Sequence, residues 1–458
     1  MKNGKIFLVG FGPGAQEHMT QRALQAIEQS DVVIGYSTYI NLVKHLLDGK
    51  EVVRKGMTEE IDRCVEAYEQ AKLGKTVALI SSGDIGVYGM AGPTYEVLLK
   101  SGWTVPENPD SGIQVEVIPG STALSACASL VGAPLTHDFC SISLSDLLTP
   151  WPVIAKRLDA AAKSDFVIAL YNPKSGRRTQ HIIEAQRIIM QYRSANTPVA
   201  IVKSAYRDLQ DIQMVTLDKM TECKIGMLTT VLIGNSSTYM DQGLMITPRG
   251  YANKYDDITG STLENEKRGR SLSMGLGGWK SCVRQYLCDS KAHSLRDIAR
   301  HFDMPMGHIL SAISEADADS PAGEFKALAL PPNELQQAID SAKQWGRIRA
   351  VVRSDAGAVS ELMIDAADFK SRGNWLNIEN DHFHLHINWT QVHSAWLVSR
   401  GDSLRSVVFT DTKDESVFNV SLIREKGQFE PQALQQFEQL WQSYSDTEIC
   451  NTEELEIA

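Results

Sequence analysis

The feature that most constrains the fold of this chain is a set of three glycine-rich turns, each of which follows an apolar segment. The turns are VGFGPGA (9–15), SSGDIGVYGMAG (81–92) and IPGSTAL (118–124). Glycine lets a backbone approach another backbone or a ligand closely, and the strands of a parallel sheet end at one edge. We therefore expect an α/β sheet whose three turns converge on one crevice.

The rest of the first 250 residues supports this fold class. Residues 4–100 alternate apolar runs with amphipathic stretches, which predicts a parallel sheet covered by helices. The alternation continues over 137–246 and predicts a second α/β lobe. The predicted strands are 5–10, 31–36, 76–84, 114–120, 165–173, 197–205 and 229–235, and the clearest helices are 20–30, 58–74 and 121–132. The two lobes are expected at about 1–135 and 136–250.

A different pattern begins after residue 250. Residues 251–280 are rich in glycine, serine and charge and are predicted to be a linker. Residues 281–458 then form a smaller α+β domain, with short β-rich segments beyond 345 that predict an antiparallel sheet and a closing helix at 431–444.

Two helices are predicted at 294–302 and 304–314, in the outline of a helix-turn-helix. A DNA reader needs base-reading and phosphate-binding side chains on its second helix. Because MPMGHILSAIS is nearly uncharged and largely apolar, it is better interpreted as a helix that packs against a core.

The first turn also satisfies the spacing G-x-G-x-x-A of a dinucleotide site, through Gly10, Gly12 and Ala15. Such a site needs an acid at the end of the second strand and free N–H groups for a pyrophosphate. Here Asp31 precedes that strand and Pro13 lacks the N–H group. The dinucleotide interpretation is therefore weak, and a tight turn without a ligand stays as an alternative.

Composition limits the partners. The net charge of −11 argues against nonspecific nucleic-acid binding as the main role. The seven cysteines contain no C-x-x-C pair, which fits a reducing compartment and gives no zinc or iron–sulfur signature. No stretch reaches about 18 apolar residues and the start shows no secretory pattern, so we expect a cytoplasmic protein that binds neither nucleic acid nor membrane.

Residues 4–255 carry a family resemblance. The segments that carry it are FLVGFGPG, GYSTYI, SSGDIGVYGMAG, VIPGSTALSACASLVGAPLTHDFCSISLSD, ALYNPKSGRR, SAYRD, TTVLIGNSSTY and ITPRGY, in unbroken order. Together they resemble the tetrapyrrole methylases of cobalamin biosynthesis, in particular the precorrin-3B C17-methyltransferases. The resemblance implies a homodimeric two-lobed enzyme that binds S-adenosylmethionine between its lobes. The implied reaction is C17 methylation with ring contraction of a tetrapyrrole substrate, precorrin-3B or cobalt-precorrin-3.

The resemblance also assigns roles to residues. The implied cofactor contacts are Pro13, Gly83, Asp84, Val87, Thr122, Ala123, Tyr171, Ala205 and Thr230. Methyl transfer from a sulfonium needs no nucleophilic side chain, only aligned reactants.

Other residues are expected to meet the substrate. Tyr36 and Tyr39 are expected beside it, and Lys174, Arg177 and Arg178 to pair with its carboxylates, unless that loop is simply solvated. Ring contraction benefits from an acid or base, for which His137 and Asp138 are the candidates. A helix cap by Asp138 and an ordinary loop imidazole at His137 are the alternatives.

The segments after the linker are, in order, SLRDIARHFDMPMGHILSAIS, WGRIRAVV, AVSELMI, RGNWLNIENDHFHLHINWTQVHSAWLVSR and FNVSLI. Over residues 281–445 they resemble the ChuX/HutX family of heme-utilisation carriers. The segment DHFHLHI places His382, His384 and His386 at alternate positions, so a strand would turn all three to one face. His384 and His386 match the family's H-x-H element and are the predicted metal ligands, whereas Trp375 replaces a family aromatic and its indole cannot ligate iron.

The resemblance implies a domain that binds heme or a cobalt corrinoid, or another tetrapyrrole, for the methylase. Two alternatives stay open. The domain could be a heme-binding sensor or a module for assembly with other cobalamin-pathway enzymes, or the histidines could simply lie on the solvent face of a half-buried strand.

Overall fold

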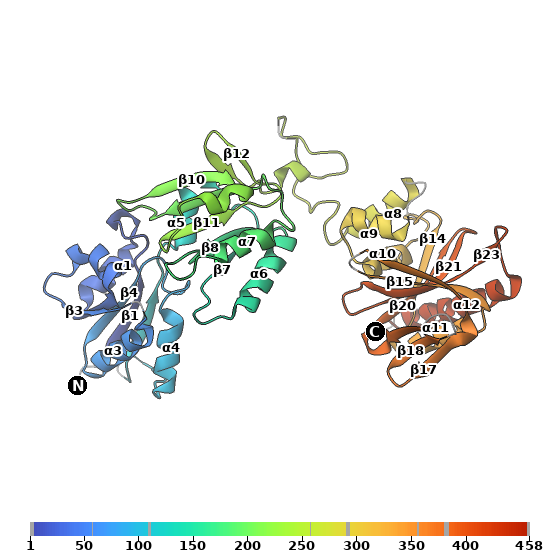
Figure 1. Cartoon of the computed structure of the whole chain (residues 1–458), viewed down its shortest axis with the longest axis horizontal. Helices are drawn as coiled ribbons and strands as arrows, with labels where there is room; N and C mark the ends of the chain where they lie inside the picture. The colour runs from blue at the N-terminus through green and yellow to red at the C-terminus, as the bar shows by residue number, and fades with distance from the viewer. Residues whose placement is uncertain are drawn as a thin grey trace. The chain divides into compact units, whose positions relative to one another are not determined.

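The computed structural model describes residues 4–56, 58–108, 111–256, 258–289, 294–354, 357–379 and 384–455. The chain divides into two compact units, Met1–Tyr251 and Ala252–Ala458 (Figure 1). Apart from Tyr251, the predicted linker, 251–280, falls at the start of the second unit. Along the described parts of the chain, no helix has the length and apolar character needed to cross a membrane.

The first lobe of unit 1 is a parallel sheet covered on both faces. Its strand order is β3-β2-β4-β1-β5, with bounds Glu51–Lys55, Val32–Tyr36, Thr76–Ser81, Lys5–Gly10 and Gln114–Ile118. Alternate residues of β1 point to opposite faces. Phe7 and Val9 pack with helices α1 (Gln21–Gln29) and α2 (Ser37–Leu42), and Ile6 and Leu8 with α3 (Glu60–Lys72) and α4 (Ala91–Lys100).

The second lobe is also α/β, but its sheet is mixed. Its order is β10-β9-β11-β8-β7, with bounds Asp211–Thr216, Pro198–Lys203, Thr229–Ile233, Val167–Tyr171 and Phe139–Ser143. Only β7 and β8 pair in parallel; the other pairs are antiparallel. The β9–β10 pair is antiparallel because the loop that joins these strands has only a few residues and cannot make the crossover that parallel strands require.

Helices cover both faces of this second sheet. Helices α6 (Trp151–Lys163) and α7 (His181–Ile189) pack on one face and α5 (Ala123–Ser129) on the other. Helix α5 therefore belongs to the second lobe by packing, although the predicted boundary near residue 135 placed it in the first. A small sheet, β12-β13-β6, adds the strands Tyr239–Asp241, Leu244–Ile246 and Gly132–Ala133.

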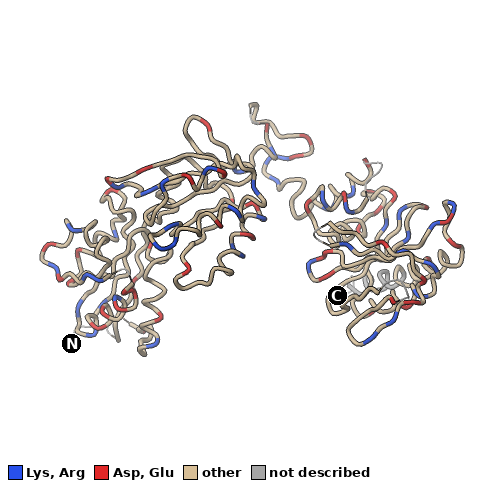
Figure 2. Tube along the Cα trace, viewed as in Figure 1, with Lys and Arg blue, Asp and Glu red and all other residues tan. Residues whose placement is uncertain are grey.

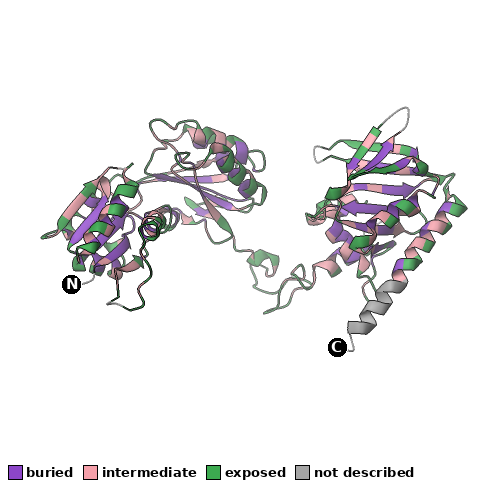
Figure 3. Ribbon diagram, turned by 90° about the horizontal axis from the view of Figure 1, so that it is seen from below, coloured by how far each residue is buried: buried purple, intermediate pink, exposed green. Residues whose placement is uncertain are grey.

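Unit 2 is built on an antiparallel six-stranded sheet, as predicted for an α+β domain (Figures 1 and 3). Its order is β14-β20-β21-β22-β15-β16, with bounds Phe325–Ala329, Ser394–Arg400, Leu404–Thr410, Ser416–Leu422, Arg347–Arg353 and Val359–Asp365. A three-stranded sheet, β17-β18-β19, spans Phe369–Arg372, Trp375–Glu379 and His384–Asn388. Strands β23 (Arg424–Glu425) and β24 (Gln428–Phe429) form a two-stranded antiparallel ribbon.

The two faces of the large sheet carry separate cores. One core joins the sheet to β17–β19, α11 (Leu335–Ala342) and α12 (Pro431–Leu455). The other joins it to α8 (Trp279–Asp289), α9 (Leu295–Phe302) and α10 (Met306–Ser314). The helix pair with a helix-turn-helix outline thus buries Ile298, Ile309 and Leu310 against the sheet. Acidic and basic residues are interspersed along both units (Figure 2).

Candidate functional site

The three glycine turns meet at the carboxyl ends of β1, β4 and β5. A Cβ atom on Gly120 would lie 2.3 Å from the carbonyl oxygen of Gly83 and 2.5 Å from that of Gly10. Gly12 and Gly83 are joined by two backbone hydrogen bonds, N–H of Gly12 to O of Gly83 at 3.0 Å and the reverse at 2.7 Å. Only glycine allows backbones to pack this closely. The predicted convergence of the turns is therefore present.

Asp84 holds two of these turns together. Its Oδ1 accepts a hydrogen bond from the N–H of Gly86 at 2.7 Å, and its Oδ2 accepts one from the N–H of Gly120 at 3.0 Å. A carboxylate bound by backbone N–H groups is a strong, orienting acceptor. This structural role was not foreseen from the sequence, where the side chain suggested only ligand binding.

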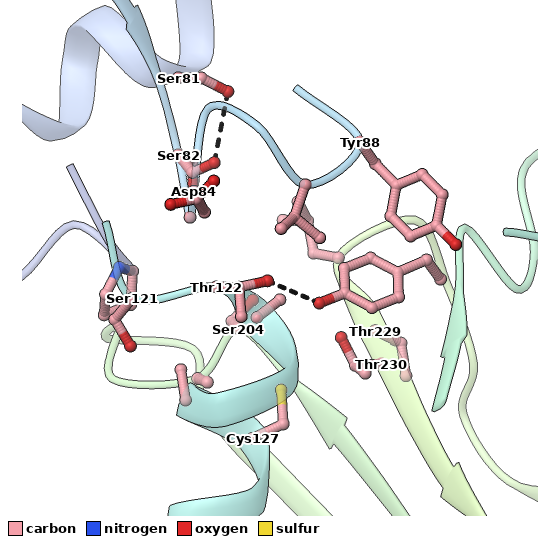
Figure 4. A pocket seen from close by; sticks show the side chains of 18 of the residues that line it. Ser81, Ser82, Asp84, Tyr88, Ser121, Thr122, Cys127, Ser204, Thr229 and Thr230 are labelled. Carbon is pink, nitrogen blue, oxygen red and sulfur yellow. Dashed lines mark hydrogen bonds between the residues drawn. The ribbon is translucent and has the colours of Figure 1, made fainter. Parts of the chain in front are cut away.

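The second lobe closes the site through Tyr171, at the end of β8. Its hydroxyl accepts a hydrogen bond from the N–H of Leu124 at 2.7 Å and shares another with Thr122 Oγ1, also at 2.7 Å (dashed from Thr122 in Figure 4). Burial raises the pKa of Tyr171, so the hydroxyl stays protonated at neutral pH. Tyr171 therefore fixes the start of α5 beside the third glycine turn.

A pocket lies between the two lobes, and every residue predicted to contact the cofactor lines it. These are Pro13, Gly83, Asp84, Val87, Thr122, Ala123, Tyr171, Ala205 and Thr230. Figure 4 shows that Ser82 and Asp84 of the first lobe face the same space as Cys127 and Thr230 of the second. Residues up to 217 positions apart in the chain, from Pro13 to Thr230, thus share one surface.

Tyr88 joins the lobes at the pocket. Its backbone has a φ of 52°, a left-handed conformation that costs energy for a non-glycine residue. Its Oη donates a hydrogen bond to the carbonyl oxygen of Ser141 in β7 at 3.0 Å, and its ring centroid lies 4.9 Å from that of Tyr171. Although it lines the pocket, Tyr88 was not among the predicted contacts; its position between glycines in the second turn was the available signal.

Arg207 is a second pocket residue that was not predicted. It lies in the loop between β9 and β10, two positions after the predicted contact Ala205, and its guanidinium reaches across to the first lobe. Nε donates to the carbonyl oxygen of Pro13 at 2.5 Å, and Nη2 donates to Ser82 Oγ at 2.6 Å. Its charge in the segment SAYRD was visible in the sequence, but its partners, more than 120 positions away, were not.

In unit 2, strand β19 has the predicted alternation. Leu385 and Ile387 pack against the core, while His384 and His386 are exposed on the other face with ring centroids 6.1 Å apart. His382 lies outside the described residues. His386 Nδ1 lies 2.6 Å from Asn377 Oδ1 on β18. An amide oxygen only accepts, so Nδ1 is the donor in this contact, and in the neutral imidazole Nε2 is then the nitrogen with the lone pair.

Known proteins of the predicted methylase family resemble this chain. Residues 5–221 match the family described as Tetrapyrrole (Corrin/Porphyrin) Methylases. The Probable cobalt-factor III C(17)-methyltransferase of Salmonella typhimurium is 49% identical over 246 residues, which cover 54% of this chain and 99% of that protein. The chain belongs to the tetrapyrrole methylase family. The predicted resemblance, and with it the enzyme class of an S-adenosylmethionine-dependent methyltransferase, is confirmed.

Two further comparisons concern the methylase part. The Cobalt-factor III methyltransferase of Priestia megaterium is 58% identical over 252 residues, which cover 55% of this chain but only 46% of that protein. A solved structure, of the methyltransferase CobJ, is 30% identical and covers 54% of this chain and 100% of that chain, with a TM-score of 0.48. The match with the Priestia relative thus spans only about half the length of that protein.

The second unit matches another family. Residues 328–440 match the family described as Haem utilisation ChuX/HutX, so the second resemblance is confirmed as well. Within the residues that the structure describes, no group of three or more His, Cys, Asp or Glu side chains could hold a metal ion. Two imidazoles are too few to hold a bare ion, but one of them could take the single axial position that a metal in a macrocycle offers to this face.

Some of the residues predicted to contact the methylase substrate line the pocket and others do not. Tyr39 lines the pocket. Tyr36 packs edge-on against Tyr39, with ring centroids 5.3 Å apart, but does not line it. Lys174 is half-buried and Arg177 exposed, and neither lines the pocket.

Arg178 is held inside its own loop region. Nη1 donates to Ser145 Oγ at 3.2 Å and Nη2 to the carbonyl oxygen of Asn172 at 3.0 Å, and Asn172 lines the pocket. Arg178 thus positions the wall of the methylase pocket rather than presenting a free guanidinium to it.

The predicted acid–base pair of the methylase lies away from the pocket. His137 and Asp138 precede β7, and the carbonyl oxygen of Asp138 accepts a hydrogen bond from the N–H of Val167 at the start of β8. Tyr171, which lines the pocket, stands at the other end of β8. Because a five-residue strand is about 16 Å long, the structure does not bring this pair to the site.

Proposed function

We propose that unit 1 is an S-adenosylmethionine-dependent enzyme that methylates C17 of precorrin-3B or its cobalt-containing counterpart, cobalt-precorrin-3, with ring contraction, in cobalamin biosynthesis. The observation that carries the proposal is that the family's cofactor positions, drawn from both lobes, all line one pocket. The cobalt-containing substrate is favoured because the Salmonella and Priestia relatives are both named for cobalt-factor III.

The residues of the pocket fit this cofactor. When bound, S-adenosylmethionine supplies an electrophilic methyl group. The glycine turns offer close backbone contact, Thr122 and Tyr171 offer hydroxyl groups, and Val87 and Met227 offer apolar contact. Their role is to hold the reacting atoms roughly 3–3.5 Å apart in line and to exclude water.

Cys127 is the one thiol in the pocket lining, and its protonation suits this chemistry. Burial raises the pKa of Cys127 to about 11, so the thiol stays neutral at physiological pH. Because the thiolate is the nucleophilic form, a neutral thiol does not compete with the substrate for a methyl group.

The full-length chain tests this proposal. It should be incubated with methyl-labelled S-adenosylmethionine and with the tetrapyrrole at the precorrin-3 stage, once with cobalt and once without. We expect one labelled methyl group in the product, identified by mass spectrometry, and a changed visible spectrum on ring contraction. Label in neither tetrapyrrole, from a protein that binds the cofactor, would refute the assigned substrate.

We further propose that unit 2 binds a metallo-tetrapyrrole, heme or a cobalt corrinoid, through His384 and His386. The observation that supports this is the exposed imidazole pair, with Nε2 of His386 left free by the bond to Asn377. The exposed face of β18 adds the indole of Trp375, on which a macrocycle could stack. A domain that holds the pathway's unstable substrate or product would supply it to the methylase at high local concentration.

A visible-spectrum titration of the full-length chain with iron and cobalt tetrapyrroles tests this second site. We expect a shifted absorption band that is lost in a His384→Ala/His386→Ala double variant and kept in His393→Ala, which removes another exposed imidazole of unit 2. An identical band in the double variant would exclude these residues as ligands.

The same variants distinguish delivery of the tetrapyrrole by unit 2 from the alternative, a heme-binding sensor or assembly module. If unit 2 delivers substrate, the double variant should lower methyl transfer at limiting tetrapyrrole concentration. If turnover is unchanged while binding is lost, the module interpretation holds.

The proposal extends to assembly and location. We expect a cytoplasmic homodimer, with other cobalamin-pathway enzymes as transient partners. Light scattering on the purified chain tests the dimer directly, since a monomer mass at micromolar concentration would exclude it.

A further inference from the structure

Arg207 is the one arginine in the lining of the methylase pocket. It is anchored to both of the first two glycine turns, through Pro13 O and Ser82 Oγ, and Ser82 Oγ itself donates to the carbonyl oxygen of Gly12 at 3.3 Å. The loop that carries it is tightly folded, with left-handed φ values of 51° at Ser204 and 56° at Tyr206. The guanidinium is therefore held in a fixed position between the lobes.

This guanidinium has an unused donor. Among the described residues, Nε and Nη2 of Arg207 make hydrogen bonds, but Nη1 makes none. Arg284 in unit 2 shows the ordinary arrangement of a buried arginine: Nε, Nη1 and Nη2 bind Ser320, Ala312 and Ser281, respectively. Arg207 is half-buried and lines the pocket, so its unpaired Nη1 is open to a ligand there.

It also has no counter-ion. In the described part of the chain, no Asp or Glu side chain forms an ion pair with Arg207, whereas the buried Arg193 of the same lobe pairs with Asp165. The groups that act on its charge are Tyr39 and Cys127, and neither is a carboxylate. The carboxylate of Asp84, which also lines the pocket, is already bound by the N–H groups of Gly86 and Gly120. A positive charge removed from water without a partner calls for an anion.

We propose that Arg207 binds a carboxylate group of a pocket ligand through its free Nη1 edge. The inference rests on the proposed function, because the two sources of a carboxylate there are the amino-acid end of S-adenosylmethionine and an acetate or propionate of the tetrapyrrole. Guanidinium suits this task, since its planar donors match a carboxylate and its charge is permanent.

Calorimetric titration of the full-length chain distinguishes the two sources. The ligands are S-adenosylhomocysteine and decarboxylated S-adenosylmethionine, which lacks the carboxylate. If Arg207 holds the cofactor, Arg207→Met weakens S-adenosylhomocysteine binding roughly 10- to 100-fold and leaves the affinity for the decarboxylated compound unchanged. If it holds the substrate, both affinities stay unchanged and KM for the tetrapyrrole rises by a similar factor with kcat preserved.

Two results would overturn the inference. Equal losses for both cofactor compounds would mean that Arg207 only shapes the pocket, and no change in any of the three values would mean that it meets no carboxylate. Binding by the wild type alongside either result would leave the proposed function intact, whereas a wild type that binds neither compound would refute that function first.

Two further variants distinguish a loss of ligand binding from a loss of folding. Arg187→Met removes an exposed arginine of α7 in the same lobe and should leave every value unchanged. If thermal unfolding shows that Arg207→Met is not folded, Arg207→Lys takes its place: it keeps the charge but loses the planar fork. Lysine should give a smaller loss with the same selectivity between the two compounds.

Discussion

At the scale of single residues, the site depends on contacts that only the smallest side chain permits. Gly10, Gly83 and Gly120 bring three turns so close that their backbones touch, and Asp84 then binds two of those turns through its carboxylate. The pocket is thus shaped by backbone before any side chain enters it. This makes the glycine contacts the most sensitive part of the site.

Gly120→Ala should expose this sensitivity. The added Cβ would collide with two backbone carbonyl oxygens that cannot move independently, so we expect a loss of about 1–3 kcal/mol in the free energy of unfolding and weaker S-adenosylhomocysteine binding. The control is Gly92→Ala in helix α4, where a Cβ meets no atom within 4 Å and alanine favours the helix. Urea unfolding of both variants provides the measurement; equal stability of the two would contradict the packing argument.

Cys127 gives a pH-dependent prediction. Its raised pKa, about 11, means that almost no thiolate forms at pH 8, whereas Cys288 is exposed. Iodoacetamide at pH 8 should therefore alkylate Cys288 well before Cys127, as followed by peptide mass spectrometry. Labelling of Cys127 should begin only as pH approaches 11, and equally fast labelling of both at pH 8 would show that the thiol is not desolvated.

The sequence predicted some residues of the site and missed others, for physical reasons. The contacts named in advance lie in or next to glycine turns and strand ends, where local sequence fixes the backbone. Arg207 and Tyr88 were missed because their roles depend on partners in the opposite lobe, Pro13 and Ser141. Pairings of that kind follow from how the lobes dock, which no local pattern specifies.

At the scale of elements, the approximate positions of the strands and helices of unit 1 were predictable, but their ends and the pairing of the strands were not. β1 and β4 match predicted apolar runs because parallel strands are buried on both faces. The antiparallel pairs of the second sheet and the docking of α5 on it were not predicted. Apolar periodicity shows that a strand is buried and does not specify its neighbour.

The edge strand β5 supplies a prediction at this scale. Glu116 accepts two hydrogen bonds from Arg22 of α1, each at 2.7 Å, and pairs with Lys5 of β1 at 2.8 Å. Mainly because of the Arg22 bonds, the pKa of Glu116 falls from its ordinary 4.5 to about 2. A folded-state pKa below the unfolded value gives stability that is present above pH 4.5 and lost as pH falls toward 2.

Glu116→Gln should therefore lower the thermal midpoint at neutral pH, and the gap to the wild type should narrow as pH falls through that window. Calorimetric scans at several pH values measure the gap. Glu184→Gln, which removes half of an exposed pair on α7, is the matched control and should show little gap at any pH. A gap for Glu116→Gln that is independent of pH would mean that the ion pair contributes nothing.

At the scale of the whole molecule, each unit has hydrophobic cores of its own. Among the described residues, the cores of unit 1 gather residues from 6 to 245 and those of unit 2 residues from 283 to 444, and none is shared. We expect each unit to fold without the other. A fragment of residues 1–251 should bind S-adenosylhomocysteine within about twofold of the full chain, as measured by calorimetry. Aggregation of the fragment, or a much weaker affinity, would show that unit 2 supports the methylase.

Binding of S-adenosylmethionine in the pocket between the lobes of unit 1 is the proposal on which the others depend. The measurement that tests it most directly is calorimetric binding of S-adenosylhomocysteine to the full-length chain and to Val87→Trp, which fills the pocket from a partly exposed lining position. Val105→Trp, an exposed position outside the lining, is the control. We expect the wild type and the control to bind alike and Val87→Trp to lose about tenfold or more in affinity. Unchanged binding by folded Val87→Trp, or no binding by the wild type, would contradict it.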